Sequence, residues 1–239
     1  MALNKILLYF IMLEFSSITV TNIGYEELTN NALESLKIIN NEVKPIIYCM
    51  DNESSNNFKK RNYTTILLDY RLSTSCEYMK ENWANVTMQK LVAIYKELNM
   101  NKPFVFMFDG DIVFKNSNAI TDLCKIMESN NDIDLICQNE YQNNKSELNT
   151  GYMFVRNNDK TKEFFNPLNY INKYKNDQHF VNHEKHLLNI HVLPNDKFPN
   201  GKYFYENHNS IEPYIIHFNF IKGNSKKQKM KSHKCWLLE

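Results

Sequence analysis

The stretch Phe104-Val-Phe-Met-Phe-Asp-Gly-Asp-Ile-Val-Phe114 decides how this sequence is expected to fold. Its first five residues are all apolar, which is typical of a strand that is buried on both faces of a sheet. The apolar run stops at Asp109, and Asp111 follows after a single glycine. In an open α/β sheet, ligands bind beyond the carboxyl ends of the strands, and the two carboxylates are predicted to lie there.

Strand and helix patterns alternate on both sides of this segment. An amphipathic helix is predicted over 83–98, just before it, and another helix over 118–127, just after it. The other predicted elements are strands at 16–21, 45–50, 64–69, 133–137, 151–156 and 214–218, and helices at 26–39 and 176–188. Such alternation predicts an α/β fold, in which a mostly parallel, Rossmann-like central sheet carries helices on both faces.

The 239 residues are expected to form a single domain, because no repeat and no linker rich in proline or glycine divides them. We place this domain at 16–239. The segment 1–15 that precedes it is interpreted as either a short signal peptide or an extra strand. No apolar run reaches the roughly 18 residues of a membrane-spanning helix.

Composition excludes several classes of function. The 28 Lys+Arg nearly balance the 27 Asp+Glu, which argues against a nucleic-acid coat or a polybasic membrane binder. The five glycines are too far apart for a dinucleotide-binding fingerprint or a phosphate-binding P-loop. The five scattered cysteines favour a reducing compartment, so a cytoplasmic location is predicted, with the endomembrane lumen as the alternative. Enrichment in Asn, Lys and Ile indicates an AT-rich genome, such as that of a virus or a protist.

Asp109 and Asp111 are the first candidates for chemistry. On an extended chain they would point the same way, and their carboxylates would repel each other unless a cation lay between them. A hard divalent ion is the usual answer, and without it a change of either residue to Asn would stabilise the protein. Gly110 would let the backbone come close to a ligand.

Two other interpretations of this pair remain open. One is an acidic turn that binds no ion. The other is the DxDx[TV] motif of haloacid dehalogenase-type phosphatases, in which Asp109 would be the nucleophile. In those enzymes the motif ends the first strand of the core, whereas three predicted strands precede it here.

Further short motifs follow one another in an informative order, from residue 18 to residue 236. They are Thr21-Asn22-Ile23-Gly24-Tyr25, Thr87-Met88-Gln89-Lys90, Phe108-Asp109-Gly110-Asp111, Asn149-Thr150-Gly151, Asn176-Asp177-Gln178, Phe198-Pro199-Asn200-Gly201, and His217-Phe218-Asn219 with Gly223 and Lys226. In this order they resemble the nucleotide-diphospho-sugar transferase family. The resemblance is to retaining glycosyltransferases of the GT-A fold, similar to glycosyltransferase family 77 and more distantly to family 8.

This resemblance implies a hexosyl- or pentosyltransferase. The enzyme would move a sugar from a nucleotide-diphospho-sugar, a UDP-sugar in the first place, to a hydroxyl of a glycan or glycoprotein. Asp109, Asp111 and His217 would hold Mn²⁺ or Mg²⁺, and the imidazole suits Mn²⁺ better. The metal would stabilise the charge that develops on the departing diphosphate.

The resemblance also implies which residues bind the donor. Lys226, or else Lys227, would contact the diphosphate as a point charge, and Gly223 would let the backbone approach it. Asp177 and Gln178 would line the donor sugar, on which transfer proceeds at one face with retention of configuration. The remaining residues implied at the donor are Thr21, Asn22, Gly24, Tyr25, Lys90, Asp109, Asn149 and Gly151.

Ordinary structural explanations compete with these assignments. His217 could be a satisfied core histidine, Lys90 an exposed helix lysine, and most of 222–231 a solvated basic tail. Three other histidines, His179, His183 and His186, are spaced as on a helix and could mimic a metal cluster. The HExxH motif of metalloproteases is absent, however, and their side chains are expected to be exposed. A catalytically silent GT-A domain that binds sugar or protein is the alternative function.

Overall fold

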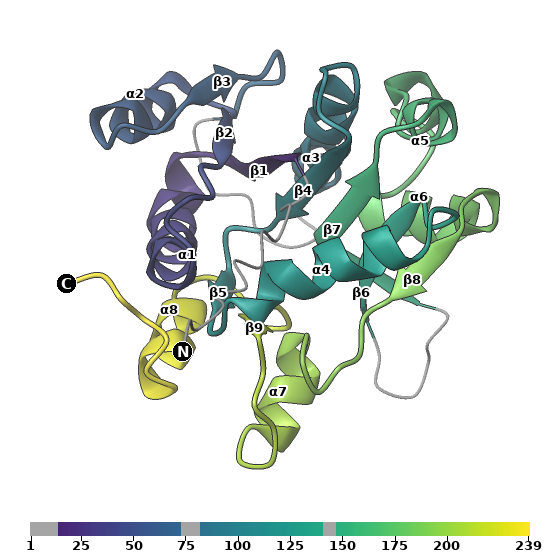
Figure 1. Ribbon diagram of the computed structural model, residues 1–239. Coiled ribbons are helices and arrows are strands. Elements are labelled where there is room, and N and C mark those ends of the chain that lie inside the picture. Colours follow the sequence, from purple (N-terminus) through teal and green to yellow (C-terminus); the bar gives the residue numbers. More distant parts are fainter. Residues whose placement is uncertain (1–13, 73–81, 141–146) are drawn as a thin grey trace, which may run out of the picture.

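A seven-stranded sheet forms the centre of the computed structural model, which describes residues 14–72, 82–140 and 147–239 (Figure 1). In spatial order its strands are β3 (Thr65–Leu67), β2 (Ile46–Cys49), β1 (Phe15–Thr21), β4 (Phe104–Phe108), β7 (Leu148–Arg156), β6 (Leu135–Asn139) and β8 (Ile190–Val192). Neighbours pair in parallel except β7, which is antiparallel to both β4 and β6. The prediction of a mostly parallel α/β sheet is therefore confirmed.

Helices cover both faces of this sheet, as predicted. One face carries α1 (Glu26–Ile39), α2 (Asn52–Lys60) and α4 (Asn118–Ser129), whose apolar residues join one core cluster. The opposite face carries α3 (Trp83–Leu98), α5 (Asp159–Phe164) and α6 (Asp177–Glu184), which contribute to a second cluster. Short 3-10 turns lie at Ile23–Tyr25, Pro167–Asn169 and Lys185–Leu187.

A second, two-stranded sheet lies beside the main one. It pairs β5 (Ile112–Phe114) with β9 (Ile215–His217) in antiparallel fashion. Two helices, α7 (Gly201–Asn207) and α8 (Asn224–Ser232), complete this part of the fold near the C-terminus (Figure 1). Phe204 of α7 and Met230 of α8 are buried in a third, smaller core cluster with residues of β5 and β9.

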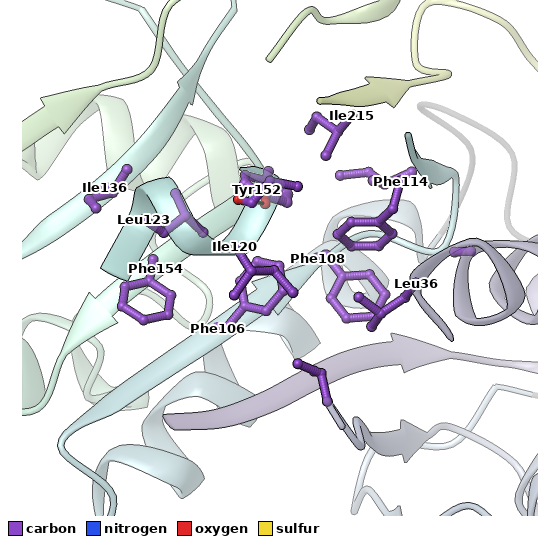
Figure 2. Packing of buried hydrophobic residues seen from close by; sticks show 14 of the residues in the cluster. Leu36, Phe106, Phe108, Phe114, Ile120, Leu123, Ile136, Tyr152, Phe154 and Ile215 are labelled. Atoms are coloured by element: carbon purple, nitrogen blue, oxygen red, sulfur yellow. Dashed lines mark hydrogen bonds between the residues drawn. The ribbon is translucent and has the colours of Figure 1, made fainter. Parts of the chain in front are cut away.

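Every residue of strand β4 is buried. Its side chains alternate between the two core clusters, with Phe106 and Phe108 on one face and Met107 on the other. The ring of Phe106 packs edge-to-face on Tyr152 of β7, with 5.1 Å between ring centroids (Figure 2). A fully buried aromatic side chain contributes about 1.5–3 kcal/mol. This packing holds the end of β4, and hence Asp109, in a fixed position.

The order of the strands explains where a ligand can bind. From β1 the chain continues outward to β2 and β3, and it returns to the other side of β1 with β4. The carboxyl ends of β1 and β4 therefore border a topological switch point, which is where open α/β sheets bind ligands. Because β7 runs antiparallel to β4, its first residues reach the same edge, and Asp109 N–H donates to the Gly151 carbonyl at 2.8 Å.

Several local predictions differ from the structure. Residues 109–111 form a turn between β4 and β5, so the prediction of an extended chain is wrong there. Most of 222–231 forms the helix α8 rather than an irregular tail. Much of it is solvated, as predicted, but the side chains of Lys226 and Met230 are buried. The patterns did not predict α5, α7 or β8, and the polar stretch between β2 and β3 is α2.

The predicted N-terminal segment, 1–15, lies largely outside the described residues, which begin at Glu14, and β1 starts at Phe15. Within the described parts of the chain, no helix has both the length and the apolar character that crossing a membrane requires.

Candidate active site

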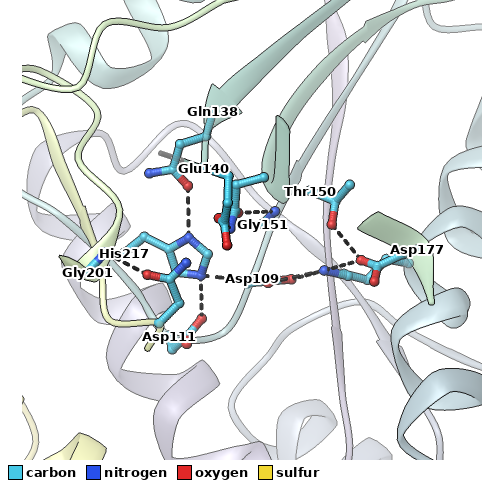
Figure 3. Close-up of polar contacts among 12 residues, drawn as sticks. Asp109, Asp111, Gln138, Glu140, Thr150, Gly151, Asp177, Gly201 and His217 are labelled. Atoms are coloured by element: carbon cyan, nitrogen blue, oxygen red, sulfur yellow. Dashed lines mark hydrogen bonds and ion pairs between the residues drawn. The ribbon is translucent and has the colours of Figure 1, made fainter. Parts of the chain in front are cut away.

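Asp109, Asp111 and His217 meet at the carboxyl edge of the sheet (Figure 3). The pairing of β5 with β9 places His217 opposite Ile112, next to the acidic turn. His217 Nε2 lies 3.3 Å from Asp111 Oδ1 and 3.8 Å from Asp109 Oδ2. One ligand atom from each residue lies within 4.8 Å of the other two. Two carboxylates and one imidazole are a donor set that fits a divalent ion such as Mn²⁺.

Two lysines neutralise the carboxylates. Lys226 from α8 pairs with Asp111, and both side chains are only 7% exposed. Lys90 from α3 lies 3.1 Å from Asp109 Oδ1 and 2.6 Å from Asp177 Oδ2. The sequence argument was that a cation must lie beside the two aspartates to relieve their repulsion. In the structure, the ammonium groups of Lys90 and Lys226 lie beside Asp109 and Asp111, so the repulsion alone does not require a metal ion.

This burial shifts the ionisation of the cluster. Burial raises the pKa of Asp109 above its ordinary value, although Lys90 opposes the shift. Burial acts in the same direction on Asp111, but Lys226 and His217 outweigh it and hold the pKa of Asp111 well below its usual range. Burial lowers the pKa of Lys90, and the carboxylates of Asp109 and Asp177 reverse this and hold it above its ordinary value.

Asp177 is linked to the acidic turn through Lys90. It begins α6, is 3% exposed, and its Oδ2 also accepts a hydrogen bond from Thr150 Oγ1 at 2.6 Å. Asn176 caps the helix by accepting from His179 N at 2.8 Å. Gln178, the next residue, is half-buried, and its backbone carbonyl accepts from Asn182 Nδ2.

The first residues of β7 form the floor of the site. A Cβ atom on Gly151 would lie 2.3 Å from His217 Cε1 and 2.8 Å from Asp109 Oδ2, so only glycine fits. Asn149 Oδ1 accepts from Gly151 N, and Asn149 Nδ2 donates to Glu140 Oε2 at 2.5 Å. Glu140, which is 8% exposed, lies in a polar stretch in which the sequence showed no site signal.

The segment after β1 borders the same edge. Thr21 Oγ1 lies 2.9 Å from Thr29 Oγ1, and Asn22 Oδ1 accepts from Tyr25 N. The ring of Tyr25 lies below Lys226 Nζ, 5.6 Å from ring centroid to nitrogen, whereas Gly24 is exposed. Through Lys226, Tyr25 therefore borders the acidic cluster.

Gly110 has a packing role that differs from the predicted one. A Cβ atom there would lie 2.3 Å from Thr29 Oγ1 and 3.2 Å from Thr29 Cα, so the turn can pack on α1 only without a side chain.

Other predicted residues lie around α8 or away from the cluster. Gly223 precedes α8 with a φ of +52°, a conformation that favours glycine. Lys227 pairs with Glu27 at the surface, so Lys226 is the lysine that reaches the acidic cluster. On α6, His183 is exposed and pairs with Glu184, and the helix histidines contribute to no three-ligand group in the described parts of the chain.

Comparisons with known proteins identify the family. The family model for nucleotide-diphospho-sugar transferases matches residues 41–231, and the chain therefore belongs to this family. It is a glycosyltransferase. The expectation drawn from the order of the short motifs is confirmed. No curated protein matches the chain.

Solved structures show the same fold at low identity. A glycosyltransferase involved in the glycosylation of the major capsid of PBCV-1 is 12% identical with a TM-score of 0.58, and the match covers 91% of this chain and 98% of that one. GlyE of Streptococcus pneumoniae TIGR4 is 13% identical with a TM-score of 0.59, and the match covers 95% of this chain and 61% of GlyE. An active-site mutant of LgtC is 10% identical with a TM-score of 0.58, and the match covers 94% of this chain and 97% of LgtC. These likenesses show the GT-A fold.

Proposed function

We propose that this protein is a metal-dependent retaining glycosyltransferase that moves a sugar from a nucleotide-diphospho-sugar, a UDP-sugar in the first place, to a hydroxyl of a glycan or glycoprotein. The observation that carries the proposal is the cluster of Asp109, Asp111 and His217 at the switch point of the sheet. Two lysines border this cluster, Lys226 (7% exposed) and Lys90 (12% exposed), and such cations favour the binding of a diphosphate.

Asp109, Asp111 and His217 would hold Mn²⁺ or Mg²⁺, which supplies Lewis-acid stabilisation of the leaving diphosphate when bound. Lys226 is paired with Asp111 and is positioned to contact a diphosphate oxygen as a point charge. Gly223 leaves open space beside the first turn of α8, since a Cβ atom there would meet nothing within 4 Å. Tyr25 and its neighbours after β1 would line the nucleoside.

Asp177 and Gln178 are proposed to line the reacting face of the donor sugar. Because Asp177 Oδ2 already contacts Lys90 and Thr150, this carboxylate is better suited to holding sugar hydroxyls than to attacking carbon. An amide is a poor nucleophile, so Gln178 favours transfer on one face. In that route a diphosphate oxygen takes the proton of the acceptor hydroxyl, and the anomeric configuration is kept.

The two alternatives have less support. A phosphatase of the DxDx[TV] type would need Asp109 as a free nucleophile after its first core strand. Here Asp109 follows the fourth strand along the chain and pairs with Lys90. A silent domain would have no reason to retain a complete set of metal ligands.

The test is a panel of sugar nucleotides, headed by UDP-sugars. We expect one donor to be hydrolysed slowly, and to raise the unfolding temperature, in the presence of Mn²⁺ or Mg²⁺ but not after chelation. Donor turnover that is unchanged by chelation would contradict metal dependence. Turnover of a simple phosphomonoester in place of a sugar nucleotide would favour the phosphatase.

The product is expected to keep the anomeric configuration of the donor. Gln178→Ala should lower kcat more than it raises KM, because its contacts matter most as charge develops on the sugar. Gln228→Ala, an exposed position on α8, is the matched control and should change neither. Proton NMR of the first-formed product reads the anomer directly, and an inverted product would make Asp177 the candidate base.

A further inference from the structure

Gln138 lies at the end of β6, and its side chain is completely buried. The register between β6 and β7 shifts between Cys137 and Gln138, as at a β-bulge. Bulges redirect side chains and are frequent next to active sites. In Figure 3 the amide of Gln138 points at the ring of His217, on the side away from Asp111. This glutamine belongs to none of the motifs that predicted the site.

The orientation of the Gln138 amide is determined by its other partner. Its nitrogen, Nε2, lies 3.0 Å from the backbone carbonyl oxygen of Phe198, which can only accept a hydrogen bond. The amide NH₂ must therefore face Phe198. The amide oxygen then faces His217 Nδ1 at 2.8 Å, and this oxygen can only accept. Consequently the proton of the pair is carried by Nδ1 of His217.

A proton on Nδ1 leaves the lone pair of the neutral ring on Nε2. This is the nitrogen that lies 3.3 Å from Asp111 and 3.8 Å from Asp109. A histidine binds a metal through such a lone pair, and its other N–H is commonly held by an acceptor. We infer that Gln138 is a positioning residue, which keeps the proton of His217 on Nδ1 and so directs the Nε2 lone pair into the acidic cluster.

Removal of this acceptor has a definite consequence. Among the described residues, Gln138 is the acceptor that faces Nδ1, whereas Asp111 Oδ1 could accept a hydrogen bond from an Nε2–H group. The ring would then carry its proton on Nε2, and that proton would keep Nε2 from binding a metal ion. The inference rests on the proposed metal site for its purpose, but the tautomer itself exists without metal.

The test is nitrogen NMR of metal-free protein labelled with ¹⁵N-histidine, at about pH 9, where ordinary histidines are neutral. In the unmodified protein we expect His217 to carry its proton on Nδ1. A His217→Gln sample assigns the signal by its absence. Gln138→Met removes the acceptor at similar volume and should move the proton to Nε2, whereas Gln138→Glu keeps an acceptor oxygen and should leave it on Nδ1.

Metal affinity, measured by calorimetry with Mn²⁺ alone, is the second readout. Gln138→Met should bind Mn²⁺ about 10- to 100-fold more weakly, and Gln138→Glu should recover most of this loss. Gln89→Met is the matched control: Gln89 is 8% exposed and its amide donates to Asn85 O in its own helix, so affinity should not change.

An Nε2–H tautomer in the unmodified protein would overturn the inference, even if Gln138→Met failed to fold. The same tautomer in Gln138→Met as in the unmodified protein would overturn it as well. These outcomes differ from failure of the proposed function, in which the unmodified protein would show the Nδ1–H tautomer yet bind no Mn²⁺ and turn over no donor.

Discussion

Asp111→Asn is expected to lower metal-dependent turnover by more than about 100-fold, because even residues that only support a metal ligand are worth 10- to 100-fold. It is also expected to destabilise the protein. The substitution leaves the ammonium of Lys226, whose side chain is 7% exposed, without its counter-charge. Removing one partner of a buried ion pair costs about 3–5 kcal/mol, and the retained amide oxygen places the expected loss near the lower end. This reverses the sequence-based prediction that the change would be stabilising.

Turnover with Mn²⁺ and urea unfolding measure the two effects. Asp122→Asn is the control, since Asp122 pairs with the exposed Lys125 of its own helix at 3.6 Å and the change should alter stability by less than about 1 kcal/mol. Full turnover in Asp111→Asn would remove this residue from the metal site. A stability equal to that of the unmodified protein would show that Lys226 finds another partner.

Lys90→Met is expected to have the largest effect on stability among the site residues. Its ammonium bridges Asp109 and Asp177, so its loss leaves two carboxylates facing each other in a poorly solvated site. Breaking such a buried pair costs about 3–5 kcal/mol. Turnover should fall as well, because Asp109 and Asp177 are held in position by the same nitrogen.

Lys96→Met provides the comparison on the same helix. Lys96 lies 3.5 Å from Asp69, whose side chain is almost fully exposed, and such surface pairs contribute less than about 1 kcal/mol. Bound Mn²⁺ should restore part of the stability of Lys90→Met, because the ion supplies positive charge beside Asp109. Equal losses for the two lysine variants would show that Lys90 does not act as the bridge between the carboxylates.

The sequence predicted best those elements whose apolar residues follow a clear pattern, either an unbroken run or one face of a long helix. The apolar run 104–108 was predicted as a buried strand and forms β4, and the apolar stripe of α3 led to a helix with the predicted bounds, Trp83–Leu98. Short elements such as α5, α7 and β8 carry too few residues for a period to appear, and their conformation depends on tertiary packing.

The candidate site divides in the same way. Asp109, Asp111 and His217 could be assigned to a metal site from the sequence because the short motifs follow one another in the order that the family shows. The turn at 109–111 was not predictable, since Thr29 of α1 and the pairing of β5 with β9 shape it. Glu140 and Gln138 gave no signal, because a polar residue at a strand end is common in any sequence.

By itself, the sequence determined the fold class, the family and the identities of the acidic pair, because these depend on periodicity and on the order of residues along one chain. Only the tertiary structure decided what surrounds that pair. Lys90 and Lys226 approach it from helices far apart in sequence, and Gln138 reaches His217 across 79 positions. Which buried charge meets which counter-charge depends on distance in space, and spacing along the chain does not encode it.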